Sequence, residues 1–122
     1  MDKTNNLYVK SLDLAKEIIL LYRELDKKLF EKEITKQFLR SGTSVGANVA
    51  EAQGSISEPD YIAKIHIAYK ELLETEYWID LLLATDSITQ EKADTILQKT
   101  NELSKILYTI IKNIRAKTKS KI

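Results

Sequence analysis

The side chains able to carry out catalysis are few in this sequence. There is no cysteine and only one histidine, His66, among 122 residues, so a thiol nucleophile is excluded and a serine triad has a single base available. No phosphate-binding glycine loop is present. A carboxylate metal centre in a helical bundle needs Glu-x-x-His on two helices, and the residue three positions before His66 is Ala63. We therefore predict that the chain is not an enzyme and holds no metal or other cofactor.

Three glutamates are candidates for polar contacts between helices. Glu51 follows Asn48 in a run of small residues, and Glu74 and Glu76 lie further along the chain, Glu76 at a position where the periodicity predicts an apolar side chain. A buried acid needs hydrogen-bonding or charged partners. We expect Asn48, Glu51 and Glu74 to bond across helices or subunits. A metal site formed by the three glutamates is the alternative.

The basic residues are concentrated at the C-terminal end. No acid follows Glu102, so residues 105–122 carry +6 and residues 1–104 carry −5 in a chain of net charge +1. A cationic helix C-terminus is favoured by the helix dipole, and such an asymmetry also marks segments that meet RNA or DNA. The candidate nucleic-acid contacts are Lys105, Lys112, Arg115, Lys117, Lys119 and Lys121.

The three glycines form a ridge in one predicted helix. Gly42, Gly46 and Gly54 are separated by multiples of four residues, with Ala50 in the gap. A glycine inside a helix costs about 1 kcal/mol relative to alanine, and close approach of another helix backbone compensates for that cost. The approaching helix belongs either to the same chain or to another subunit. For Gly54 the alternative to packing is a left-handed conformation that ends its helix.

Aromatic residues cluster in the next helical segment, which contains Tyr61, Tyr69, Tyr77 and Trp78. We expect these rings to lie in the core or in a subunit interface, with stacking on nucleic-acid bases as the alternative. The predicted helix-packing or oligomer interface consists of Gly42, Gly46, Asn48, Ala50, Glu51, Glu74 and Trp78.

Four segments with apolar residues at helical spacing position these side chains. They cover about residues 7–28, 33–54, 58–85 and 89–117, and a short basic tail follows that is expected to fray. Ser57 is expected to cap the third segment, and Ser87 or Thr89 the fourth. Connections of a few residues make consecutive helices antiparallel. The sequence predicts an all-α fold, an antiparallel up-down-up-down four-helix bundle, as a single domain over residues 1–122.

The composition also bears on location. Three glycines, one proline and no cysteine disfavour a turn-rich β fold and exclude a disulfide framework. No apolar run reaches the roughly 20 residues of a membrane span, and the first residues lack the apolar stretch of a signal peptide. We therefore expect a cytoplasmic protein with no membrane partner.

Four stretches of the second and third segments together form a recognisable pattern. They read ITKQFLRS at 34–41, SVGANVAEA at 44–52, AYKE at 68–71 and ETEYWI at 74–79. This pattern resembles the four-helix bundle family of 23S rRNA intervening-sequence proteins, most strongly from residue 34 to residue 83. Members of that family are often encoded inside inserts of bacterial ribosomal RNA genes.

The resemblance implies a bundle that assembles into a ring-like homopentamer, without enzyme activity. A relative in diversity-generating retroelements binds nucleic acid beside a reverse transcriptase. The sequence departs from the family at Ala52, where a glycine usually follows Asn-x-Ala-Glu, and it lacks the strongly basic character of that relative.

A ring would gather the basic C-terminal segments of its subunits on one rim, where they would create a strong local positive field. We therefore expect a homo-oligomeric scaffold that binds RNA or DNA through this rim. The alternative is a protein–protein adaptor with no nucleic-acid role.

Overall fold

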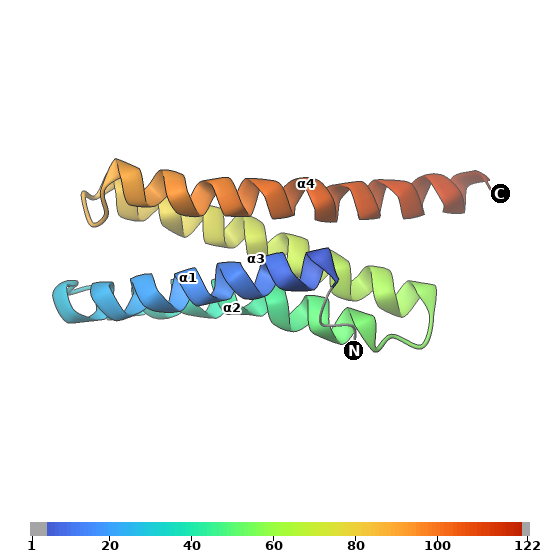
Figure 1. Cartoon of the computed structure of the whole chain (residues 1–122), viewed down its shortest axis with the longest axis horizontal. Helices are drawn as coiled ribbons and strands as arrows, with labels where there is room; N and C mark the ends of the chain where they lie inside the picture. Colours follow the sequence, from blue (N-terminus) through green and yellow to red (C-terminus); the bar gives the residue numbers. More distant parts are fainter. Residues whose placement is uncertain (1–4, 121–122) are drawn as a thin grey trace.

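Four helices make up almost all of this computed structural model, which describes residues 5–120. They are α1 (Asn6–Lys28), α2 (Lys32–Gln53), α3 (Glu58–Ala84) and α4 (Gln90–Ser120). Consecutive helices run in opposite directions along one long axis (Figure 1). The predicted all-α, antiparallel four-helix bundle is confirmed. None of the described helices is long and apolar enough to span a membrane.

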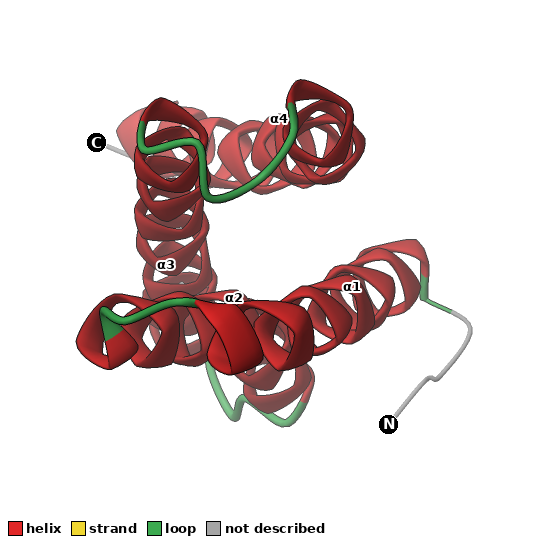
Figure 2. Ribbon diagram, turned by 90° about the vertical axis from the view of Figure 1, so that its left-hand side faces the viewer, coloured by secondary structure: helices red, strands yellow, loops and turns green. Residues whose placement is uncertain are grey.

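Each helix packs on its neighbours in sequence, and α4 also packs on α1. Contacts join α1 to α2, α2 to α3, α3 to α4 and, least extensively, α1 to α4, whereas the diagonal pairs have no Cα atoms within 8 Å of each other among residues 5–120. Figure 2 shows the helices nearly end-on, with α2 and α3 adjoining and α1 and α4 on the same side of them. Each helix therefore has an inner face and an outer face that meets solvent.

The inner stripes of all four helices form one apolar core. In α1 the apolar residues at helical spacing Leu7, Leu14, Ile18, Leu21 and Leu25 are all buried. In α4 the buried residue of the last turns is Ile111, while Ile110 and Ile114 are only half-buried. The four-residue step from Leu107 to Ile111 keeps the stripe in line with the core, because an α-helix has 3.6 residues per turn.

Side-chain caps begin three of the helices. The Asn5 side chain accepts a hydrogen bond from the Leu7 amide at 2.9 Å, the Ser57 hydroxyl accepts from the Asp60 amide at 3.2 Å, and the Thr89 hydroxyl accepts from the Lys92 amide at 3.1 Å. These oxygens satisfy backbone N–H groups that have no partner inside the helix. The predicted Ser57 cap is confirmed, and Thr89 is the cap of α4.

The helix ends differ from the predictions at two places. Gly54 has φ −94°, so the left-handed alternative for this residue is wrong. The left-handed residue is Asp86 (φ 59°) after α3, where the amides of Asp86 and Ser87 bond to carbonyl oxygens of the last turn at 3.0 and 2.8 Å, as in a Schellman motif. The fourth helix, predicted to end at about residue 117, continues to Ser120, and the last two residues of the predicted basic tail lie outside the described residues.

Candidate nucleic-acid interface

Four cations and one aromatic ring form a straight line along the outer face of α4. Lys105, Tyr108, Lys112, Arg115 and Lys119 follow one another at alternating spacings of three and four residues, which places them on one side of a helix, and all five are exposed. We call the four cations the basic stripe. It is about 21 Å long at 1.5 Å per residue. The opposite face of α4 lies in the core, which fixes the orientation of the stripe.

Two acids near the stripe, one in α4 and one in α3, are paired with cations outside the stripe. Glu102 binds Lys10 of α1, and Glu58, at the start of α3, lies 3.0 Å from Nζ of Lys117. Lys117 is therefore placed toward α3 and away from the basic stripe. The three lysines of the stripe form no ion pair within residues 5–120, so their charge remains available to an anionic ligand. Lys121 lies outside the described residues.

Rings of α3 support the edge of the basic stripe. The ring centroids of Tyr69 and Tyr108 are 6.2 Å apart, with their planes inclined at 43°. About two turns further along α4, Nη2 of Arg115 lies 3.2 Å from Nε2 of His66. His66, the single histidine of the sequence, is half-buried. These contacts hold two members of the line in place from a neighbouring helix.

The helix dipole explains only part of this arrangement. Its effect on charged side chains is confined to the last turn of a helix. Lys117 and Lys119 lie in the last turn of α4, whereas Lys105 and Lys112 lie well before it. The dipole therefore accounts for the end of the cationic segment but not for its full length.

The glycine ridge approaches α1 of the same chain. A Cβ added to Gly42 would lie 2.7 Å from both Cγ atoms of Ile18, and one added to Gly46 would lie 3.4 Å from the backbone oxygen of Ser11. Ala50 lines the adjoining groove between α1 and α2. The described contacts of Gly42 and Gly46 are thus intrachain contacts between α1 and α2.

Two polar residues of α2, Asn48 and Glu51, each form one hydrogen bond or ion pair. The Asn48 side-chain amide donates to the Ser44 carbonyl at 2.9 Å, within α2, and does not cross to another helix. Glu51 pairs with Lys64 of α3 at 3.4 Å, and its side chain is 60% exposed. Exposed pairs of this kind contribute little to stability. Of these two residues, only Glu51 bridges helices.

A larger network joins the outer sides of α2 and α3. Arg40 Nη1 donates to both carboxylate oxygens of Glu71, at 3.2 and 3.0 Å, and Nη2 donates to Glu74. Glu74 also accepts a hydrogen bond from Nε1 of Trp78 at 3.2 Å. Hydrogen bonding to Glu71 raises the pKa of Arg40. The half-buried Trp78 therefore orients Glu74 toward Arg40, and the network links the two central helices.

Two further hydrogen bonds cross between helices nearer the core. Glu76 accepts from the Thr100 hydroxyl of α4 at 2.9 Å, which explains why an acid occurs at an apolar position of the pattern. The buried Thr75 hydroxyl donates to the Ser41 hydroxyl of α2 at 3.0 Å. Neither contact had been predicted. Within residues 5–120 no group of three His, Cys, Asp or Glu side chains is placed to bind a metal ion.

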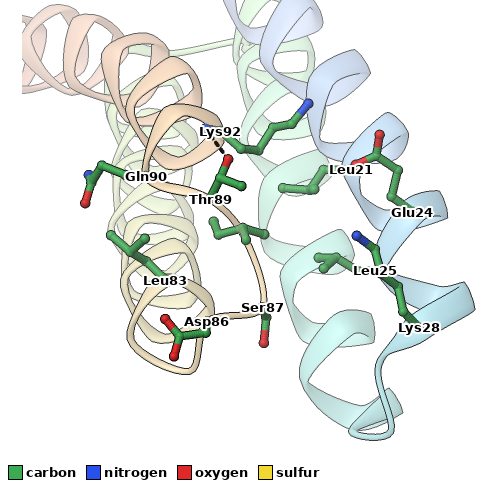
Figure 3. Close-up of a pocket in the computed structure, with 11 residues that line it drawn as sticks. Leu21, Glu24, Leu25, Lys28, Leu83, Asp86, Ser87, Thr89, Gln90 and Lys92 are labelled. Atoms are coloured by element: carbon green, nitrogen blue, oxygen red, sulfur yellow. Dashed lines mark hydrogen bonds between the residues drawn. The ribbon is translucent and has the colours of Figure 1, made fainter.

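A cavity of about 600 Å³ opens where α1 ends beside the turn between α3 and α4 (Figure 3). Leucines of α1 and α3 line it together with two lysines, Lys28 and Lys92, and two acids, Glu24 and Asp86. The hydrogen bond drawn there is the Thr89 cap of α4 (Figure 3). Neither histidine nor cysteine is among the residues that line it.

Comparison with known proteins gives a family and a related fold. The model of the 23S rRNA-intervening sequence protein family matches residues 3–109. A crystal structure of a protein with unknown function from the S23 ribosomal protein family of Bacteroides thetaiotaomicron is 44% identical in sequence, with a TM-score of 0.81. The match covers 87% of this chain and 98% of that one. No curated protein matches the chain.

The family match ends before most of the basic stripe. The matched residues include α1 to α3 and α4 as far as Thr109, and they end before Lys112. Neither the family description nor that of the related structure names an enzymatic activity. Since the family model covers most of the sequence, this chain belongs to the family of 23S rRNA-intervening sequence proteins.

Proposed function

We propose that this chain is a non-enzymatic, cytoplasmic scaffold that assembles with copies of itself and binds RNA or DNA through the basic stripe of α4. The observation that carries the proposal is the alignment of Lys105, Lys112, Arg115 and Lys119 on one exposed face. Cations held along a rigid helix contact successive phosphates and release counterions, which is the main source of sequence-independent nucleic-acid affinity.

Self-assembly is supported by apolar side chains on the outer face of α1. Val9, Leu12 and Leu20 are 46, 56 and 45% exposed, and they line one shallow groove with Ala15 and Ile19. Grouped exposed apolar residues mark interaction surfaces. The resemblance to the family suggests a pentameric ring, in which several basic stripes would act together on one long nucleic acid.

Binding is tested with a structured RNA and a duplex DNA over a salt series. Four phosphate contacts predict a slope of log K against log salt of about −2.8 on a single strand and −3.6 on a duplex for each subunit engaged. Substituting the four stripe cations by glutamine should abolish most of the affinity. The matched control removes the same amount of charge elsewhere, at Lys27, Lys28, Lys36 and Lys70, which are exposed and lie outside both the stripe and the α1 groove. Equal losses in the two variants would refute a localised site.

Assembly is tested by light scattering of the purified protein. We expect a particle of pentamer size, and a smaller one after Leu12→Glu, because a buried charge without a partner is strongly unfavourable in an apolar interface. A wild-type monomer at micromolar concentration would refute self-assembly. The exposed apolar face of α1 would then favour the second candidate, an adaptor for another protein, provided that no nucleic acid binds at low salt.

A further inference from the structure

We infer that the basic stripe is built for single-stranded nucleic acid, with one base stacked on the ring of Tyr108. This inference rests on the proposed function and adds the class of ligand. A row of cations alone does not distinguish a single strand from a duplex, since both present phosphates. The distinction comes from the aromatic ring that lies in the same row.

Tyr108 lies within the line of cations. It is between Lys105 and Lys112 on the exposed face of α4, and 52% of its surface is exposed. Behind it, Tyr69 of α3 is half-buried, and the two ring centroids are 6.2 Å apart. The exposed ring is thus supported from the side of the bundle.

A ring in this position interacts with a single strand in a way that it cannot with a duplex. Aromatic side chains interleaved with cations accept unstacked bases on their faces, whatever the base. In a duplex the bases are stacked on each other and must be flipped out before a protein ring can reach them. Lys105 and Lys112 lie on either side of Tyr108, so they are placed to contact phosphates that flank a base on the ring. Arg115 extends the same path by one step.

The length of the stripe limits the size of the site. At about 3.4 Å per phosphate of a stacked strand, the 21 Å from Lys105 to Lys119 corresponds to at most about six nucleotides for each subunit. A strand spread apart to place a base on Tyr108 would use fewer. The expected ligand is therefore a short unpaired stretch of RNA or DNA, such as a loop or an end.

The test compares four proteins: wild type, Tyr108→Ala, Tyr108→Phe and Tyr77→Ala. Tyr77 is the matched control, because it is an exposed tyrosine (58%) on α3 that packs against Trp78 and lies outside the stripe. Fluorescence anisotropy measures binding to oligo(dT), to oligo(rU) and to a DNA duplex, each of about twelve units, roughly twice the footprint. Circular dichroism and light scattering show that each variant keeps its fold and assembly.

We expect Tyr108→Ala to lose about 5- to 150-fold in affinity for both single strands, the effect of one stacked base. Affinity for the duplex should change little, and Tyr108→Phe and Tyr77→Ala should bind like wild type. If Tyr108→Ala loses the same factor in affinity for oligo(rU) and for oligo(dT), the ring contacts the base and not the sugar.

Two other outcomes would overturn the inference, and they differ in what they say of the proposed function. If wild type binds nucleic acid with the salt dependence expected of the stripe, but Tyr108→Ala binds all ligands equally well, the stripe is a phosphate-binding surface without stacking. If wild type binds neither the single strands nor the duplex at low salt, the nucleic-acid role itself fails.

Discussion

Replacing Gly42 with alanine tests how closely α1 and α2 approach. The added Cβ would lie 2.7 Å from both Cγ atoms of Ile18 and 3.1 Å from its Cβ, and Ile18 is fully buried. Rotation of Ile18 about χ1 does not relieve the overlap, because every rotamer leaves at least one Cγ toward Gly42 and the Cβ does not move. The two helices must therefore separate, and well-packed cores resist such a shift.

The size of the effect follows from two opposing contributions. Overpacking a core costs about 1–3 kcal/mol, and replacing a mid-helix glycine with alanine returns about 1 kcal/mol. Overlap with several atoms of one buried side chain favours the upper part of the range, so we expect Gly42→Ala to destabilise the protein by about 1–2 kcal/mol. Gly46→Ala is the matched control: its nearest atom is the Ser11 oxygen at 3.4 Å, so it should gain up to about 1 kcal/mol.

The assay is urea unfolding, followed by circular dichroism and Trp78 fluorescence at one fixed protein concentration, because assembly makes apparent stability depend on concentration. With an m-value of about 2 kcal/mol/M, the Gly42→Ala midpoint should fall by about 0.5–1 M and that of Gly46→Ala should rise. In an Ile18→Ala background, which lacks both Cγ atoms, Gly42→Ala should cost little or nothing. A Gly42→Ala midpoint equal to or above that of wild type would refute the close approach.

Two other substitutions test contacts that the structure describes. Thr75→Val removes the buried hydrogen bond to Ser41 and should cost about 1–2 kcal/mol, whereas Ser41→Ala together with Thr75→Val should cost less than the sum of the single changes; additive urea midpoints would contradict this. Burial raises the pKa of Tyr61 above 10.0, so the protonated phenol contributes stability below about pH 10 that is lost as pH rises through the folded pKa. Stability of Tyr61→Phe should therefore fall less steeply between pH 9 and about pH 11, and an identical slope would count against this burial effect.

The core of the bundle could be predicted because each helix shows its inner stripe independently. Leu14, Ile18 and Leu21 are buried as their spacing indicates, and this does not depend on which helix packs against them. Contacts between helices are different, since they depend on register. Glu76 stood out as a polar residue in an apolar stripe, but its hydrogen bond with Thr100 follows from the relative position of α3 and α4, which a single helical pattern does not contain.

The helix ends were harder to predict because several residue types tolerate the same backbone conformation. The pattern allowed the left-handed position at Gly54, yet the chain uses Asp86, whose short polar side chain also tolerates that region. The end of α4 was placed too early because its last residues lack apolar periodicity. Lysine and alanine have high helix propensity, so the helix continues without help from the core.

The sequence contains the spacing that places Tyr108 among the cations, but a sum of charges over residues 105–122 does not show it. Only the three- and four-residue spacing puts the ring on the same face as the lysines. Tyr108 belongs to the outer of the two faces into which α4 is divided. One face supplies the core, and the other carries the basic stripe, most of which lies beyond the part of the chain that matches the family. Substitutions at Lys105, Lys112 and Lys119, which form no ion pair within residues 5–120, leave the packed face of α4 unchanged. We therefore expect those variants to keep the fold, and circular dichroism checks this.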